Sequence, residues 1–438
     1  GENISTYDGI LANAAASVQA LKGYYGEVQF LLQRRNAYNN TETIYVSRDR
    51  DTGDDSIYII RPENLANTDG SEKGELVSLP DYFTITEENN WQGFESLGSV
   101  VLNNGVDAPV VLAIDSYSIV DLPSWPETLR AKVLEPFKGV WVALNITDLD
   151  DVVGRQDNPY KVMWSSAVRY VGDVPDYWVP LDEAGDATGA GEATLVEDSS
   201  SIVAGKRLRD RFIIYKRDSV LAMDYTGSPT APFTFRNLWN DIGCYDLNSV
   251  VEWEGRHVVV GDSDVYATDG LTRTSLVDSK WREIFYSKLF NDTRTQSVLL
   301  DIDRIDDVAY VVLQRLVGEQ KYSEVYTYNF PKGQWSDRAI NHEAQYLEAL
   351  KFLRVSALPD ESLLNWAEAD YPWETMTETT WESLTPEEIG SVPRMTFAYE
   401  NDFYAVGNKY ATNSNRLQGT LKKHDIDFNE SGLDSRDG

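Results

Sequence analysis

The sequence predicts a mainly β protein: a β-propeller with a smaller, β-rich N-terminal domain that carries one helix. Two hairpins with one pattern support the propeller, because RFIIYKRDSVLAMDYTG (211–227) is followed 45 residues later by RHVVVGDSDVYATDG (256–270). Between about residues 98 and 407, six or seven hairpin-like runs follow one another with turn residues between them. A spacing near 45 residues is typical of a four-stranded propeller blade, which needs neighbours to bury both faces.

The N-terminal domain is predicted over residues 1–95. Its Ala-, Leu- and Val-rich stretch from 9 to 22 suits a helix that ends near Gly23. A hairpin follows, with β-branched and aromatic residues on either side of the turn DRDTGDD (49–55). Residues 64–95 are polar and rich in Asn, Glu and Gly, which indicates a domain boundary.

The propeller itself is predicted over residues 96–411, with a C-terminal tail at 412–438. Two stretches interrupt its strand pattern and are expected to be inserted loops, at 181–201 and 365–390. The first is rich in Gly, Ala, Asp and Ser and reads as a surface excursion.

The second inserted loop contains three tryptophans at intervals of seven and eight residues, each with a Glu close behind it: Trp366, Trp373 and Trp381. Exposed tryptophans in an acidic, Thr-rich loop usually pack onto another surface. That surface is either the propeller or a neighbouring subunit, so the three are candidate subunit or fibre contacts.

Four other tryptophans are candidates for packing between blades, where a wide aromatic ring fills the gap between splayed sheets: Trp141, Trp164, Trp253 and Trp335. Trp335 closes the turn motif YNFPKGQW (328–335), which strengthens the propeller prediction. The alternative for each is an ordinary core tryptophan.

The composition argues against binding of nucleic acid or of an anionic membrane. Acidic residues outnumber basic ones 71 to 39, for a formal net charge of -32. The densest basic clusters, 206–209 and 422–423, are expected to be solvated loops or turns.

The single Cys244 cannot form an internal disulfide and is expected in the core. No apolar run approaches the ~18 residues that a membrane span needs.

Gly261-Asp262-Ser263 follows an apolar run, as the nucleophile of some serine esterases does. The required His base could be His257, but Glu254 precedes it by three positions, so the two would point to opposite faces of an extended strand. The matched hairpin carries Asp218-Ser219 at the equivalent turn without a nearby His. We therefore expect both Asp-Ser pairs to cap turns, and predict no catalytic residue and no enzyme.

Metal and cofactor sites are not predicted either. The acidic loop at 49–55 has the carboxylate density of a calcium loop, but Ile60 stands where an EF-hand needs Glu. The carboxylates at 301–303 and 425–430 share this weakness, and no Cys/His spacing suits zinc. No P-loop or dinucleotide motif is present. The many carboxylates leave a glycosidase pair open as an alternative.

Six segments taken together resemble propeller-bearing virion structural proteins of tailed bacteriophages, and they fall between about residues 120 and 410. They are LPSWPETLRAKVLEPFKGVWVALNITD, YKVMWSSAVRYVGDVPDYW, RLRDRFIIYKRDSVLAMDYTG, EWEGRHVVVGDSDVYATDG, YNFPKGQWS and WETMTETTWESL. The family member most similar to this pattern is the tail nozzle of short-tailed phages.

The resemblance implies a homo-oligomer, a hexameric tube below the portal and adaptor that docks tail fibres. The protein would be located in the virion after assembly in the host cytoplasm, without a membrane partner. It would retain packaged DNA and pass it during ejection through transient, non-specific contact. The acid excess suits that role, because six copies would carry roughly 190 negative charges and would let a polyanion slide. The resemblance also implies that residues 1–95 form a tube or platform.

Two other functions stay open at this stage. An extracellular carbohydrate-binding or glycoside-acting propeller would also have exposed tryptophans and paired carboxylates. A general interaction hub without a viral role would have the same fold and the same lack of motifs.

Overall fold

A computed structural model describes residues 90–338, apart from 115, 151, 197–199, 229–230, 291–294 and 318–319. It also describes residue 83 and the strands at 4–7, 10–13, 17–21, 27–35, 41–48, 55–60, 75–77, 353–356, 394–399, 402–406, 411–412 and 415–416.

The described strands form seven four-stranded antiparallel sheets and two small two-stranded ones. We number the large sheets blades 1 to 7. Blade 1 holds β4 (Glu27–Arg35), β5 (Thr41–Arg48), β6 (Asp55–Ile60) and β7 (Glu75–Val77). Blade 2 holds β8 (Gln92–Ser96), β9 (Ser99–Asn103), β10 (Val110–Leu112) and β11 (Ile119–Asp121). Blade 3 holds β12 (Leu129–Phe137), β13 (Val140–Asp150), β14 (Gly154–Trp164) and β15 (Gly191–Thr194).

The remaining blades follow the same order. Blade 4 holds β16 (Ile202–Leu208), β17 (Arg211–Lys216), β18 (Val220–Tyr225) and β19 (Phe233–Trp239). Blade 5 holds β20 (Val250–Trp253), β21 (Arg256–Val260), β22 (Val265–Thr268) and β23 (Arg273–Ser275). Blade 6 holds β24 (Thr295–Asp303), β25 (Val308–Val317), β26 (Gln320–Asn329) and β27 (Gln334–Arg338).

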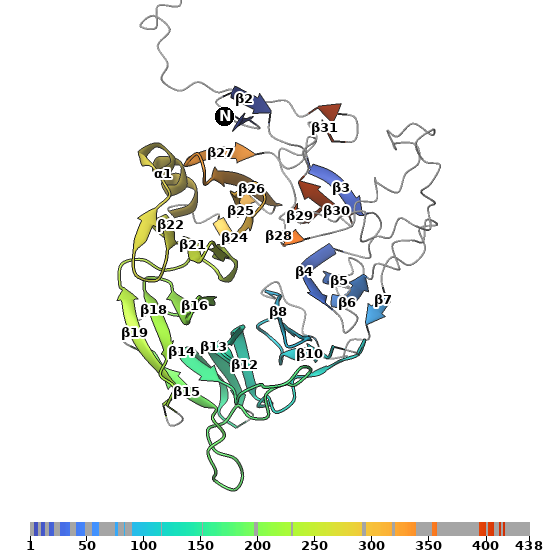
Figure 1. The fold of residues 1–438 in the computed structure, drawn as a ribbon, viewed down its shortest axis with the longest axis vertical. Coiled ribbons are helices and arrows are strands. Elements are labelled where there is room, and N and C mark those ends of the chain that lie inside the picture. Colours follow the sequence, from blue (N-terminus) through green and yellow to red (C-terminus); the bar gives the residue numbers. More distant parts are fainter. Residues whose placement is uncertain are drawn as a thin grey trace, which may run out of the picture.

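Blade 7 combines one strand from the N-terminal region with three strands from the C-terminal region. Its order is β28 (Leu353–Ser356), β29 (Arg394–Tyr399), β30 (Asp402–Val406) and then β3 (Ser17–Leu21) from the N-terminal region. The first strand of each blade contacts the first strand of the next, from β4 to β28, and β29 contacts β4. The seven blades therefore close a ring, which confirms the predicted propeller (Figure 1).

Two sequence-based predictions for the N-terminal region are wrong. The expected helix over 9–22 is replaced by β2 (Ile10–Asn13), which pairs with β1 (Ile4–Tyr7), and by β3. Pairing with β30 overrides the helix propensity of the alanines. The expected domain boundary near 95 is also wrong, because residues 27–77 build blade 1 and β3 completes blade 7. The boundary predicted between the propeller and the tail falls inside β31 (Ala411–Thr412), which pairs with β32 (Asn415–Arg416).

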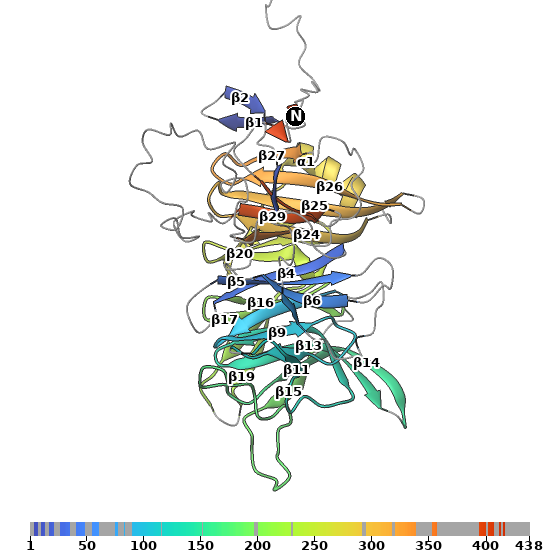
Figure 2. The same cartoon turned by 90° about the vertical axis from the view of Figure 1, so that its right-hand side faces the viewer.

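Seen from the side, the strands run along the ring axis, so their turns lie at its two faces (Figure 2). At one face, three first-to-second-strand turns have two residues that both take positive φ: Leu97-Gly98, Lys138-Gly139 and Glu254-Gly255. These are the φ signs of type I′ turns, whose twist matches that of antiparallel strands. We call this face the first-turn face and the opposite one the second-turn face.

The core lies between neighbouring blades, and all four candidate inter-blade tryptophans lie there, as predicted. Trp141 of blade 3 meets Phe94 of blade 2 edge-on, and Trp164 meets Phe233 of blade 4 in the same way. Trp253 of blade 5 stacks on Phe330 of blade 6 with 3.8 Å between ring centroids. Trp335 of blade 6 donates from Nε1 to the carbonyl oxygen of Leu276, just after the last strand of blade 5.

Helical structure is confined to short connections in the part of the chain that the structure describes. The 3-10 helix η2 (Leu247–Ser249) precedes blade 5, and α1 (Ser279–Phe285) with the π-helical turn η3 (Tyr286–Phe290) precedes blade 6. None of the described helices has the length and apolar character needed to cross a membrane.

Candidate functional site

The Asp-Ser pairs of the two matched hairpins lie at equivalent turns on the second-turn face, in blades 4 and 5. Arg217, which directly precedes the first pair, donates from Nε to Oδ2 of Asp262 in the second pair at 2.5 Å. Gly261 N donates to Asp264 O at 2.9 Å and closes the turn. The repeat thus juxtaposes a base from one blade with an acid from the next. Ser263 is exposed at this turn.

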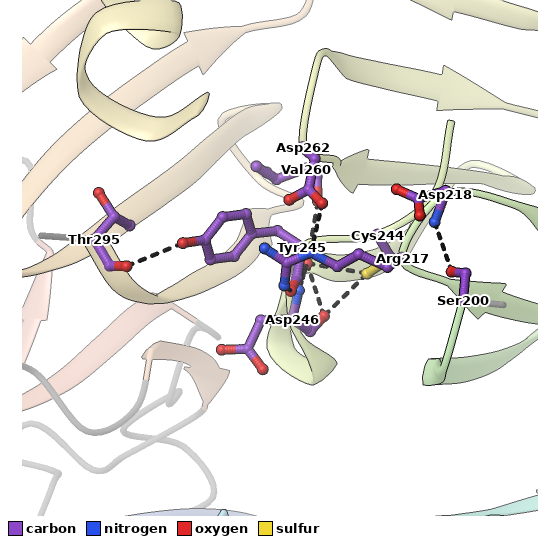
Figure 3. A network of polar contacts seen from close by, with 10 residues as sticks. Ser200, Arg217, Asp218, Cys244, Tyr245, Asp246, Val260, Asp262 and Thr295 are labelled. Carbon is purple, nitrogen blue, oxygen red and sulfur yellow. Dashed lines mark hydrogen bonds and ion pairs between the residues drawn. The ribbon is translucent and has the colours of Figure 1, made fainter. Parts of the chain in front are cut away.

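Arg217 is held from three directions (Figure 3). Besides Asp262, its Nη1 donates to the carbonyl oxygen of Tyr245 at 2.7 Å, and its guanidinium lies 4.4 Å from the centroid of the Tyr245 ring. Burial raises the pKa of the Asp262 carboxyl, against the attraction of Arg217. For Arg217, burial acts to lower the pKa, but Asp262 outweighs it and the pKa is raised.

The same cluster reaches blade 6. The Tyr245 hydroxyl donates to the carbonyl oxygen of Thr295 at 3.0 Å, at the start of β24. Asp246 caps η2, because its side chain accepts from the Leu247 amide while Ser249 Oγ accepts from the Asp246 amide. One arginine and the connection between β19 and β20 therefore tie together blades 4, 5 and 6.

Cys244 lies in the core behind this cluster, as predicted. Its Sγ lies 3.0 Å from the carbonyl oxygen of Asp246 and 3.1 Å from Ser249 Oγ. Burial raises the pKa of the thiol to about 12. The thiolate is the reactive form of cysteine, so the thiol of Cys244 is unreactive at neutral pH.

His257 is also a contact between blades. Its Nε2 lies 2.9 Å from the carbonyl oxygen of Arg207, so it carries the proton and donates, while Nδ1 accepts from the Tyr215 hydroxyl at 2.8 Å. Both partners belong to blade 4. Burial lowers the pKa of His257 to about 4, so the ring is neutral at pH 7.

These contacts decide against His257 as the base for Ser263, because both ring nitrogens already have partners. Glu254 does not orient the ring, since it forms the two-residue turn with Gly255 whose amide donates to Glu252 Oε1 at 2.8 Å. The Gly-Asp-Ser motif thus serves a turn and an inter-blade ion pair, in line with the turn role that the sequence favoured.

The basic cluster at 206–209, expected as a solvated loop, is partly strand. Lys206 and Arg207 belong to β16, and Lys206 forms an ion pair with Glu135 of blade 3. Only Arg209 lies in the following turn.

The remaining predicted sites divide between described and undescribed residues. Trp366, Trp373 and Trp381 lie outside the described residues, as do 49–54 and 425–430. Asp55 is buried, pairs with Arg48 at 2.7 Å and accepts from Trp91 Nε1 at 2.9 Å. Within the residues that the structure covers, no group of three or more His, Cys, Asp or Glu side chains is arranged to hold a metal ion.

Sequence reasoning missed a repeated asparagine contact between blades. Asn103, on the second strand of blade 2, donates to the carbonyl oxygen of Ala131 on the first strand of blade 3 at 2.8 Å. Asn145 makes the same bond from blade 3 to Ile202 of blade 4 at 2.7 Å. An asparagine inside an apolar strand, as in SVVLN and VWVALN, is the signal that could have revealed these bonds.

The central opening is bridged at the second-turn face. Asn248 Nδ2, just before blade 5, donates to Oδ1 of Asn90, just before blade 2, at 3.4 Å. Blades 2 and 5 are separated by two blades on one side of the ring and three on the other. At this point of the ring the two side chains are in contact, so no open passage runs between them.

Comparison with known proteins finds no matching family model and no matching curated protein. Among solved structures, the computationally designed Ika8 protein is 15% identical, covers 77% of this chain and 94% of its own, and has a TM-score of 0.36. An AfRom2 CNH domain is 6% identical, with 89% and 99% covered and a TM-score of 0.41. The α-L-arabinofuranosidase Arb93A from Fusarium graminearum is 9% identical, with 73% and 98% covered and a TM-score of 0.37. None of these likenesses bears on what the chain does.

Proposed function

We propose that this protein is a structural subunit of a short bacteriophage tail, the nozzle that forms the distal DNA conduit and docks tail fibres. The observation that carries the proposal is that the segments resembling that family supply contacts between blades. Trp141 and Asn145 come from the first of these segments, Trp253 from the fourth and Trp335 from the fifth. The wall of a phage tail needs a rigid subunit, and contacts between blades are what make a propeller rigid.

The polar residues that could have served catalysis support the same proposal. His257 and Asp262 each bind blade 4 from blade 5, and Cys244 lies in the core with a pKa of about 12. The side chains of His257 and Asp262 hold blades 4 and 5 together, and the Cys244 thiol contacts Asp246 and Ser249 of its own connection. A role in architecture accounts for all three without a reaction.

The conduit in this proposal lies between copies of the protein. The bond between Asn90 and Asn248 narrows the opening of each propeller, so DNA would pass through a lumen that several subunits enclose. A net charge of -32 per copy would keep such a lumen from binding the phosphate backbone. The proposed assembly is a hexamer of this chain with the portal, adaptor and tail fibre proteins as partners, located in the virion.

Light scattering and negative-stain imaging of the purified protein test this proposal. We expect a defined oligomer that appears as a ring or short tube and that does not retain DNA at physiological salt. A monodisperse monomer that hydrolyses glycosides or binds saccharides would contradict it and favour a carbohydrate-acting propeller.

A further inference from the structure

Exposed apolar side chains are concentrated on one blade. Fifteen large apolar residues are exposed among the described residues, and nine of them belong to blade 3 and its connections: Leu149, Val152, Val153, Tyr170, Val171, Tyr177, Val179, Leu181 and Val196. A group of exposed apolar side chains on a protein this acidic is typical of a contact with another molecule.

Five of the nine lie on one connection, residues 165–190 between β14 and β15, which we call the blade 3 loop. Its exposed side chains are Tyr170 at 72%, Val171 at 70%, Leu181 at 57%, Val179 at 45% and Tyr177 at 41%. A third-to-fourth-strand connection lies at the same face as the first-to-second turns. Accordingly, the Val168 amide donates to Gly139 O at 2.7 Å, at the first turn of blade 3.

The backbone of this loop is fixed, although its apolar side chains are exposed. The Gly172 amide donates to Leu97 O of blade 2 at 2.8 Å, and the Tyr177 amide donates to Ser166 Oγ at 3.0 Å. Farther along, Asp182 Oδ1 accepts from the Ala184 and Asp186 amides at 2.9 and 2.8 Å. A preorganised apolar surface loses little conformational entropy when it binds a partner.

The tryptophan-containing insertion joins two strands of a blade on the other side of the ring. Residues 357–393 connect β28 to β29 in blade 7, so the insertion starts and ends at the first-turn face, like the blade 3 loop. Blades 3 and 7 lie on opposite sides of the propeller (Figure 1). These 37 residues, doubled back on themselves, can extend about 60 Å at ~3.3 Å per residue.

We infer that the blade 3 loop binds the segment 357–393 of a neighbouring copy of this chain. Two different surfaces on opposite sides of one subunit make a head-to-tail contact, which closes into a ring when the rotation between neighbouring subunits divides a full turn. Trp366, Trp373 and Trp381 are the residue type that contributes most at interface centres. This inference rests on the proposed assembly and identifies one of its contact surfaces.

The charges define how this contact depends on salt. The segment 357–393 has nine acidic residues and no basic one, and the blade 3 loop has five acidic residues and one arginine. The two surfaces repel each other, so apolar burial must stabilise the contact. Because salt screens repulsion, the association strengthens as ionic strength rises, opposite to a contact made of ion pairs.

Substitutions in the full-length protein test the inference, with light scattering at several salt concentrations as the readout. Val171→Ser with Leu181→Ser, or Trp373→Ala alone, is expected to raise the concentration for half-assembly roughly tenfold or more. Leu271→Ser is the matched control, because Leu271 is an equally exposed apolar residue at 67% on blade 5 and should have little effect. Combining the two blade 3 substitutions with Trp373→Ala should raise the concentration for half-assembly no further than the larger single effect does, because both changes remove the same contact.

Disulfide trapping provides the second readout, since the native Cys244 is buried. Protein with Asp176→Cys, mixed with protein carrying Thr377→Cys, should form disulfide-linked pairs on mild oxidation. Asp210→Cys, on blade 4 at the same face with its side chain 93% exposed, is the control and should form far fewer.

Two results would overturn the inference. An oligomer that is unaffected by the blade 3 substitutions and traps no more than the control would refute this contact, while the proposed assembly stands. A monomer at every salt concentration would contradict both the contact and the assembly.

Discussion

His257 of blade 5 accepts a hydrogen bond from the Tyr215 hydroxyl of blade 4 at 2.8 Å, and both side chains are fully buried. The ring therefore joins two sheets only while it is neutral at Nδ1. Burial lowers the pKa of His257 from 6.5 to about 4. This depressed pKa makes the contact between blades 4 and 5 sensitive to acid.

The first prediction concerns pH. Between pH 6.5 and 4 the unfolded chain binds the His257 proton and the folded chain does not, so stability falls as pH drops through that window. His257 adds no pH dependence above it. Urea unfolding at pH 7 and pH 4.5 should show the wild type losing about 2 to 3 kcal/mol more than His257→Gln. An equal loss in both proteins would mean that His257 is not the titrating group.

The second prediction concerns Arg217. Arg217→Ala removes the ion pair with Asp262, the bond to Tyr245 O and the stacking on the Tyr245 ring, and should destabilise the protein by about 1 to 2 kcal/mol. The ion pair itself is partly exposed and should account for no more than about 1 kcal/mol.

A double-mutant cycle with Asp262→Ala, read by urea unfolding, measures that coupling. The control pair is Arg155 with Asp157, whose side chains are 62% and 58% exposed and whose coupling should be close to zero. Equal coupling in both pairs would rule out a special role for the Arg217 contact.

The third prediction concerns the repeated asparagine bond. Asn145→Ala leaves the buried carbonyl oxygen of Ile202 without its donor and places alanine at a φ of 56°. Each effect is unfavourable, and together they should lower the free energy of unfolding by about 2 to 3 kcal/mol. Exposed Asn158, replaced by Ala, is the control and should change it by under about 0.5 kcal/mol. If the two variants have the same urea midpoint, the Asn145 bond contributes nothing.

The fourth prediction concerns Cys244 as a reporter of blade separation. With a pKa of about 12 and no exposure, the thiol should resist iodoacetamide at pH 8 in the folded protein and react fully in denaturant. Mass spectrometry counts the modification. Arg217→Ala should speed the labelling, because it loosens the cluster that covers Cys244. Rapid labelling of the folded wild type would contradict the buried position.

The fifth prediction concerns ring closure. Removing residues 1–22 deletes β3 and leaves β30 as an unpaired edge in blade 7. The truncated protein should melt several degrees lower and aggregate more readily, since free strand edges pair with other chains. Differential scanning calorimetry and light scattering test this. An unchanged melting temperature would show that β3 is not needed to hold the ring closed.

The sequence alone determined what depends on local pattern. Apolar strands alternate with turn residues, and one hairpin pattern repeats after 45 residues. These two features predict the propeller and the Asp-Ser turns. The sequence also predicts four tryptophans between blades, and the structure has all four there. These features are readable because strand periodicity and turn chemistry act over a few neighbouring residues.

Only the tertiary structure decided which distant residues meet. The Ala-rich stretch before Gly23 has helix propensity, yet part of it is a strand because β30, nearly 400 residues away, offers it an edge. Likewise, Arg217 meets Asp262 and His257 meets Tyr215 because successive blades lie side by side. Neither pairing follows from spacing along the chain, since a hydrogen bond depends on separation in space, and closing the ring is what sets that separation.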